Sequence, residues 1–237
     1  MKDIISAGLT RLGLSEHTPQ AAPEQLAQYG RLLLEKNQVM NLTAIREEDK
    51  VARLHMLDCA ALLNATDFEG KTLIDVGTGA GFPGLPLKIL CPSLTVTLLD
   101  SLGKRVDWLN EVSAALGLQG VTAIHARAEE QALVKGFRDS FDFATARAVA
   151  DLRLLCELCL PYVKVGGAFL AMKSVESDAE LEGAAHCIKL LGGRVEQSVD
   201  YTVPDTDIVH RVVVIRKVAP TLKGYPRKWA KIQKAPL

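Results

Sequence analysis

From Thr72 to Ile215 the chain alternates between two apolar patterns, and this alternation constrains its fold more than any other feature. Short apolar runs have the length of strands, and the stretches between them carry apolar residues at helical spacings of three and four. Strand and helix in this rhythm predict a parallel sheet covered by helices on both faces. The predicted parallel strands are residues 72–76, 94–99, 121–126, 141–146 and 168–172.

The last two predicted strands, Val199–Val203 and Ile208–Ile215, are joined by only a few residues. Parallel neighbours need roughly 12 or more connecting residues, so this pair must be antiparallel. We therefore expect a seven-stranded, mostly parallel sheet with an antiparallel last strand.

The rest of the chain divides around this sheet. Residues 1–66 show helical periodicity, with Leu26 and Leu33 on one face, and predict an N-terminal helical cap. Residues 67–218 form the predicted core, and residues 219–237 a basic tail.

Charge is unevenly distributed along the chain. The formal net charge is zero, yet the segment from Arg211 to Leu237 holds eight Lys or Arg and no Asp or Glu, which leaves −8 on the remainder. Such a segment indicates either an anionic partner such as nucleic acid or simply a solvated terminal face.

Several classes of protein are disfavoured by composition. The N-terminus lacks the apolar run of a signal peptide, and no stretch has the length and hydropathy of a membrane span. The five cysteines fit reduced thiols, and Cys156 and Cys159, three residues apart in a predicted helix, fit core packing better than metal binding. We expect a cytoplasmic protein with no membrane contact and no metal site.

The most informative segment is the glycine-rich stretch of residues 73–84, LIDVGTGAGFPG, between the first predicted strand and the next helix. Gly79, Gly81 and Gly84 match the dinucleotide pattern GxGxxG. Asp100, 21 residues after Gly79, lies where an acid would bind a ribose. This spacing alone leaves a nicotinamide cofactor open.

Asp75, two residues before the first glycine, favours a different cofactor. A carboxylate near the loop suits the cationic amino group of S-adenosylmethionine, whereas it would repel the pyrophosphate of a dinucleotide. Together with the terminal hairpin, it favours the Rossmann-like α/β fold of class I methyltransferases.

Two methyltransferase chemistries lack their usual motifs. Amino-group enzymes often carry Asp/Asn-Pro-Pro-aromatic after the fourth strand, where this chain has residues 145–148, TARA. Pyrimidine C5 enzymes need a cysteine near that strand, but the only Cys-Pro pair, Cys91-Pro92, precedes the second strand.

A different set of motifs resembles one bacterial family, the guanine-N7 methyltransferases of 16S (small-subunit) ribosomal RNA, also called glucose-inhibited division protein B. The resemblance runs from about residue 41 to the C-terminus. It rests on Asn41–Ile45, His55-x-x-Asp58, Asp75–Gly84, Leu99–Ser101 with Lys104–Arg105, Arg147–Ala148, Ala171–Lys173 and Tyr225–Arg227. The chain departs from the family's pattern at Trp229–Ile232, where the tail is usually richer in Ala, Gly and Pro.

The resemblance implies S-adenosylmethionine as cofactor and ribosomal RNA or the small ribosomal subunit as partner, with the enzyme a monomer. The cofactor-binding residues that we expect are Gly77, Phe82, Asp100, Ala128, Glu129 and Arg147. Candidate RNA contacts are Lys104, Arg105, Lys173 and Arg227, with Arg211 and Lys228 as further cations. His55 and Asp58 are interpreted chiefly as links between cap and core.

Guanine N7 carries a lone pair and no proton, so its methylation needs positioning rather than a general base. We accordingly name no catalytic residue. Two alternatives stay open from sequence: an NAD-dependent oxidoreductase, and a non-catalytic RNA-binding assembly protein.

Overall fold

A computed structural model of the chain describes residues 1–147 and 150–237. Ala148, part of the Arg147–Ala148 motif, lies outside the described residues. The N-terminal region is helical, as predicted. It comprises α1 (Lys2–Arg11), α2 (Ala22–Met40), α3 (Glu48–Val51), a π-helical segment (Ala52–Leu57), α4 (Asp58–Ala60) and a 3₁₀ turn (Ala61–Asn64).

Strands and helices then alternate along the chain, as the apolar pattern indicates. The elements are β1 (Thr72–Val76), α5 (Gly84–Leu90), β2 (Thr95–Asp100), α6 (Gly103–Ala115), β3 (Val121–His125), α7 (Ala128–Gln131), β4 (Phe141–Arg147), α8 (Leu152–Cys159), β5 (Val163–Ser174), α9 (Asp178–Leu190), β6 (Gly193–Thr202), β7 (Val209–Lys217) and α10 (Trp229–Lys234).

The strands form one seven-stranded sheet in the order β3-β2-β1-β4-β5-β7-β6. Strands β1 to β5 are parallel, and β7 runs antiparallel to both β5 and β6. The prediction of a mostly parallel sheet with an antiparallel last strand is confirmed. The carboxyl ends of β1 to β5 therefore meet at one edge, where open α/β sheets bind ligands.

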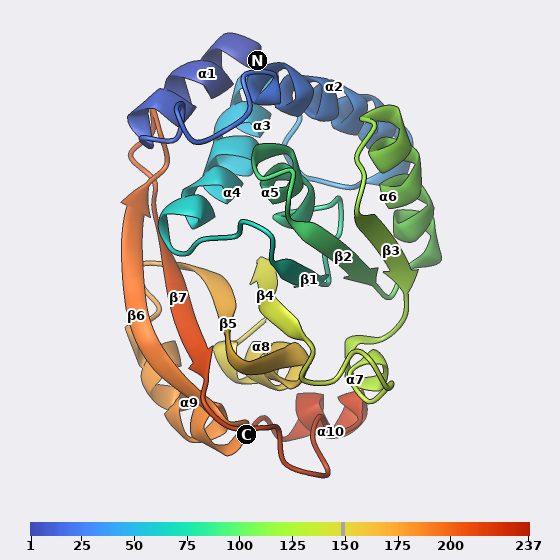
Figure 1. Ribbon diagram of the computed structural model, residues 1–237, viewed down its shortest axis with the longest axis vertical. Coiled ribbons are helices and arrows are strands. Elements are labelled where there is room, and N and C mark those ends of the chain that lie inside the picture. Colours follow the sequence, from blue (N-terminus) through green and yellow to red (C-terminus); the bar gives the residue numbers. More distant parts are fainter. Residues whose placement is uncertain (148–149) are drawn as a thin grey trace.

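Each face of the sheet has its own apolar core. Successive strand residues point to opposite faces, so Leu73 packs toward α1, α2, α5 and α6, whereas Ile74 packs toward α8 and α9. Figure 1 shows these two groups of helices on opposite sides of the sheet. Cys156 and Cys159 are buried in the second core, in keeping with packing.

Strand β5 is longer than predicted, because it begins at Val163 and runs through Gly166 and Gly167 instead of starting after them. The β4–β5 register shifts between Phe141 and Phe143, and the two glycines lie in this irregularity. Gly166 has φ of 90°, and a Cβ on Gly167 would lie 2.3 Å from the Asp142 carbonyl oxygen. The glycines permit the close approach of two strands rather than marking a loop.

No helix in the described part of the chain is long and apolar enough to cross a bilayer.

Candidate functional site

The glycine loop, residues 77–83, connects β1 to α5 at the carboxyl edge of the sheet. Gly77 and Gly79 have φ of 69° and 60°, which residues with a side chain rarely adopt. The amides of Gly77 and Thr78 donate to the Leu99 carbonyl oxygen at 2.8 and 3.1 Å, which ties the loop to the end of β2. The glycines therefore turn the backbone sharply and leave an open surface above it.

Asp75 supports this loop from below. Its side chain is fully buried, and Oδ2 accepts hydrogen bonds from Thr78 Oγ1 at 2.6 Å and from the Gly84 amide at 2.9 Å. Burial raises the pKa of this carboxyl to about 6. The sequence interpretation placed Asp75 beside the ligand's amino group, whereas in the structure it braces the loop from within the core.

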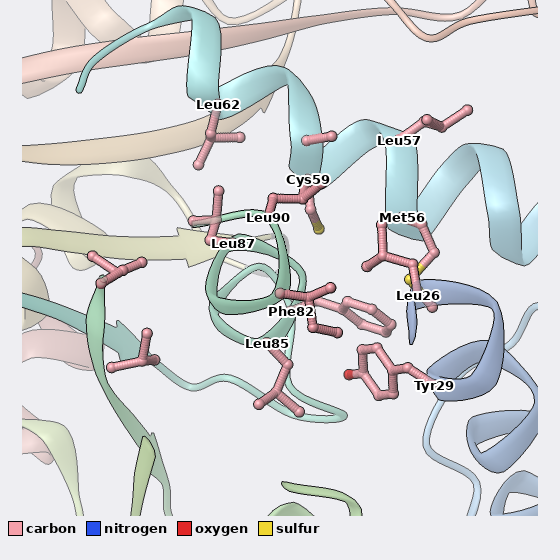
Figure 2. Close-up of a cluster of buried hydrophobic side chains, with 14 of the residues drawn as sticks. Leu26, Tyr29, Met56, Leu57, Cys59, Leu62, Phe82, Leu85, Leu87 and Leu90 are labelled. Atoms are coloured by element: carbon pink, nitrogen blue, oxygen red, sulfur yellow. The ribbon is translucent and has the colours of Figure 1, made fainter. Parts of the chain in front are cut away.

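The helical cap and α6 hold the loop from the other side. Tyr29 Oη and Trp108 Nε1 both donate to the Ala80 carbonyl oxygen, at 2.8 and 3.0 Å. Phe82 is buried against two cap residues, with its ring 5.3 Å from that of Tyr29 and 4.5 Å from that of His55. Figure 2 shows Phe82 among Tyr29, Met56 and Cys59.

A hollow of about 510 Å³ opens above the loop, and we call it the glycine-loop pocket. It brings together four of the predicted cofactor-binding residues from the ends of β1, β2 and β3. Its described lining is Val76, Gly77, Leu99, Asp100, Ser101, Arg105, Ala126, Arg127, Ala128, Glu129, Ala146, Ala150, Leu155, Leu158 and Trp229.

Two carboxylates give the glycine-loop pocket its polar character. Asp100 accepts hydrogen bonds from the amides of Gly79 and Leu102, at 3.0 and 2.9 Å, and so fixes both the loop and the start of α6. Glu129 is buried and pairs with Arg127 at 2.7 Å. A carboxylate has about four acceptor sites, so Asp100 retains capacity for hydroxyl groups of a ligand.

The pocket suits a nucleoside. Ala126, Ala128, Leu155 and Leu158 offer apolar walls for a flat base, and Asp100 offers acceptors for ribose hydroxyls. A Cβ on Gly77 or Gly79 would meet no atom within 4 Å, so this side of the loop is open to a ligand. The residues present therefore fit S-adenosylmethionine.

A second hollow, of about 380 Å³, lies beside the end of β4, and we call it the Arg147 cleft. Ala146 lines the glycine-loop pocket and Arg147 lines the cleft, because neighbouring strand residues face opposite ways. The described lining of the cleft is Leu54, His55, Asp58, Arg147, Met172, Lys173, Ser174, Glu180 and His210.

Arg147 connects the sheet to the cap. Its guanidinium lies 4.7 Å from the centre of the Phe82 ring and donates to Asp58 Oδ2 at 3.3 Å and to His55 Nδ1 at 2.9 Å. Phe82 lines neither hollow in the described structure, and Arg147 lines only the cleft. Direct contact of these two side chains with the cofactor stays a prediction.

His55 is held neutral in this arrangement. A guanidinium can only donate, so Nδ1 of His55 accepts from Arg147, and its Nε2 donates to Thr43 Oγ1 at 2.8 Å. Burial, followed by the positive charge of Arg147, lowers the pKa of His55 to about 3. His55 thus links cap to core, as the sequence interpretation favours.

Asp58 makes the same link to the last two strands. Its Oδ1 accepts from Tyr201 Oη of β6 and from His210 Nδ1 of β7, each at 2.7 Å. The hydrogen bond to Asp58 raises the pKa of His210. Sequence reasoning missed Tyr201 and His210, because neither belongs to a local motif and only the sheet order brings them to Asp58.

Some of the predicted RNA-contact residues are exposed without an ion pair, whereas others already pair with a carboxylate. Lys104 and Lys228 are exposed and have no ion pair within residues 1–147 and 150–237. Arg105 lines the glycine-loop pocket, 3.4 Å from Asp100, and Lys173 pairs with Glu180 in the cleft.

The remaining two cations are neutralised within the fold. Arg227 pairs with the buried Glu157 at 2.6 Å, and Arg211 pairs with Asp178 and Asp200. Arg216 and Lys217 likewise pair with Glu196 and Asp139. Half of the eight basic side chains after residue 210 are therefore neutralised locally.

Comparisons with known proteins identify the family of the chain. Residues 22–209 match the family model described as rRNA small subunit methyltransferase G. The ribosomal RNA small subunit methyltransferase G of Lachnoclostridium phytofermentans is 48% identical over 231 residues, 97% of this chain and 95% of that protein. The protein of the same name from Alkaliphilus metalliredigens is 45% identical over 237 residues, 100% and 98% of the two chains.

Solved structures share the fold at lower identity. An S-adenosylmethionine-dependent methyltransferase from Aquifex aeolicus is 20% identical, with a TM-score of 0.52 over 70% of this chain and 92% of that one. The oxidoreductase and assembly-protein alternatives gain no support from these comparisons. The chain belongs to the rRNA small subunit methyltransferase G family.

Proposed function

We propose that this protein transfers a methyl group from S-adenosylmethionine to N7 of a guanine in 16S ribosomal RNA. The observation that carries the proposal is the glycine-loop pocket, where the Gly77–Gly79 backbone faces the Asp100 carboxylate beside apolar walls. Membership of the family supports the choice of small-subunit ribosomal RNA.

Within the pocket we assign the cofactor contacts to Gly77, Asp100, Ala128 and Glu129. The Asp100 carboxylate would accept the ribose hydroxyls, and the backbone after β3 would flank the base. Bound S-adenosylmethionine would supply an electrophilic methyl group on a sulfonium. Phe82 and Arg147, buried against one another at the end of β4, would fix the wall of the site near that group.

The Arg147 cleft is the proposed place of the target guanine, because it adjoins the glycine-loop pocket across the end of β4. N7 attacks through its own lone pair, so the chain needs no general base. The product is a cationic purine, which the Asp58 and Glu180 carboxylates would stabilise. The residues of the cleft therefore position and stabilise rather than move a proton.

The RNA backbone would lie across the carboxyl edge of the sheet. Lys104 and Lys228 supply exposed positive charge there, and Arg105 and Lys173 would contribute from the rims of the two hollows. Arg211 and Arg227 would serve mainly to hold the fold. Phosphate contacts of this kind give affinity that depends on salt but little sequence selectivity.

At the level of the whole chain, we propose a cap of residues 1–66, a catalytic core of residues 67–218 and a basic tail of residues 219–237. We further propose that the enzyme acts as a monomer in the cytoplasm, where its ribosomal substrate is located.

The test is incubation with tritiated S-adenosylmethionine and either naked 16S ribosomal RNA or small ribosomal subunits lacking the modification, followed by nucleoside analysis. Labelled 7-methylguanosine is expected with at least one substrate, and none with an Asp100→Ala variant. Label in another nucleoside, or no label with either substrate, would refute the proposal.

A further inference from the structure

The C-terminal tail returns across the face of the molecule that carries α8, and α10 lies beside α8 and α7 (Figure 1). Arg138, which follows α7, makes the first group of hydrogen bonds that hold the tail. Its guanidinium donates to the carbonyl oxygens of Tyr225 at 2.7 Å and Thr221 at 2.8 Å. Three carbonyls of the tail, including that of Leu222, are bound by this one side chain.

A second group of hydrogen bonds holds the tail closer to α10. The Arg227 amide, Nε and Nη2 all donate to the Glu157 carboxylate, at 2.8, 2.8 and 2.6 Å. Glu157 is fully buried, so loss of Arg227 would leave its carboxylate unpaired in the core. Ile232 of α10 is also fully buried. The tail is therefore a packed part of the fold rather than a solvated arm.

The contacts of Arg138, Arg227 and Ile232 set the position of Trp229, the first residue of α10. Its half-buried indole lines the glycine-loop pocket together with Leu155, Leu158 and Ala128. It is the only aromatic side chain among the described residues that line this pocket. A large aromatic surface facing a hollow of about 510 Å³ stays in contact with water unless a ligand covers it.

We propose that Trp229 is a cofactor-binding residue and that its indole covers the adenine ring of the cofactor, so that the C-terminal tail completes the pocket. The inference rests on the proposed function, because it takes the ligand to be an adenine nucleoside. Asp100 and Glu129 supply the polar side of the pocket, and Trp229 supplies the flat apolar wall on which a base stacks.

The direct test measures the affinity for S-adenosylhomocysteine by calorimetry on the full chain. The Trp229→Ala variant should bind roughly ten-fold or more weakly, as expected for loss of a base-stacking aromatic. Trp229→Phe, which keeps a ring, should stay within about three-fold of the unchanged chain. Gln233→Ala, at an exposed position on the same helix, is the matched control and should leave the affinity unchanged.

A spectroscopic test does not depend on the stability of the alanine variant. The chain has two tryptophans, and Trp108 is 97% buried behind the loop. Added S-adenosylhomocysteine should change the fluorescence of the unchanged chain, whereas Trp229→Phe, which retains Trp108, should show little change. Equal changes in the two proteins would overturn the assignment.

The outcomes separate the two proposals. If the unchanged chain binds S-adenosylhomocysteine and Trp229→Ala binds within two-fold of it, the role of the tail is refuted and the methyltransferase function stands. If the unchanged chain does not bind this ligand at all, the proposed function itself fails.

Discussion

At the scale of single residues, Asp75 shows how a motif residue can act on a ligand site without lining it. It binds Thr78 near the start of the glycine loop and Gly84, the first residue of α5, and so holds both ends of the loop. Burial disfavours the ionised form of this carboxyl group and raises its pKa from 3.8 to about 6. Its place in the core therefore makes stability depend on pH.

The Asp75→Asn substitution tests this dependence. In the unfolded chain the carboxyl ionises near pH 3.8, so between about pH 4 and 6 the folded state binds more protons than the unfolded state. Its stability contribution falls as the pH rises through this window, by about 3 kcal/mol in total. Asparagine has no such titration and keeps one oxygen for Thr78 and Gly84. Its amide can donate to Thr145, the register partner on β4.

We therefore expect Asp75→Asn to gain stability relative to the unchanged chain as the pH rises from 4 to 7, measured by urea unfolding at each pH. Asp75→Ala removes the acceptor for the Gly84 amide and should cost roughly 1–3 kcal/mol. Parallel stability curves for Asp75→Asn and the unchanged chain would contradict the raised pKa.

Arg147 offers a second prediction at this scale, through the pKa of its neighbour. Arg147→Met removes the positive charge beside His55 and the donor to Asp58. The pKa of His55 should rise from about 3, observed by NMR titration of the ring, although burial will still keep it below 6.5.

The same variant should lose roughly 1–3 kcal/mol of stability through the broken hydrogen bonds. Arg105→Met, which removes a more exposed guanidinium 3.4 Å from Asp100, should cost less than about 1 kcal/mol. An unchanged His55 titration in Arg147→Met would show that Arg147 does not govern this histidine.

At the scale of secondary-structure elements, the packing of α1 on the π-helical segment joins the two ends of the cap. A Cβ on Gly8 would lie 2.1 Å from Leu57 Cδ1, and Leu57 is fully buried. Glycine here is required by close packing rather than by an unusual backbone angle. The same segment carries His55, so a displaced α1 would also disturb the Arg147 cleft.

Two Gly→Ala substitutions in helices should therefore have opposite effects on thermal stability. Gly8→Ala overpacks the contact with Leu57 and should destabilise the chain by roughly 1–3 kcal/mol. Gly183→Ala lies in α9, where a Cβ would meet no atom within 4 Å, and should stabilise it by up to about 1 kcal/mol. Stabilisation by both would mean that α1 can move away from Leu57 at little cost.

The same scale explains what could be predicted from the sequence. Strand β1 is a short run whose Leu73, Ile74 and Val76 lead directly into the glycine loop, so the local pattern identified it with the correct bounds, Thr72–Val76. The extent of β5 could not be predicted, because Gly166 and Gly167 signal a turn locally and only the register with β4 shows their purpose. Likewise the pairing of Asp58 with His210 joins residues 152 positions apart.

The candidate site divides in the same way. Gly77, Asp100, Ala128 and Glu129 lie at or just after the ends of strands, and the shared edge of a parallel sheet brings their segments together. Phe82, in the loop after β1, and Arg147, at the end of β4, lie at the same edge of the sheet. Their side chains, however, pack toward the cap. Trp229 could not be placed, because the position of the tail depends on Arg138 and Glu157, which carry no motif.

At the scale of the whole molecule, the distribution of free charge differs from the distribution of basic residues in the sequence. Arg211, Arg216, Lys217 and Arg227 have carboxylate partners in the fold, so the C-terminal region is less cationic toward a ligand than its composition indicates. Two exposed lysines, Lys104 at the start of α6 and Lys228 before α10, each precede a residue that lines the glycine-loop pocket, Arg105 and Trp229 respectively. An RNA that approaches this edge would meet these charges first.

The salt dependence of RNA binding tests this distribution. Each lost phosphate contact lowers the slope of log affinity against log salt by about 0.7–0.9. Lys104→Gln and Lys228→Gln should each weaken binding of 16S ribosomal RNA and reduce the slope by roughly one contact, measured by filter binding at several salt concentrations. Lys71→Gln is the matched control, since Lys71 precedes β1 at the opposite edge of the sheet and should change neither quantity. If Lys71→Gln reduced the slope as much as Lys104→Gln, the RNA would have to contact the amino edge of the sheet, and the proposed place of the target guanine in the Arg147 cleft would be untenable.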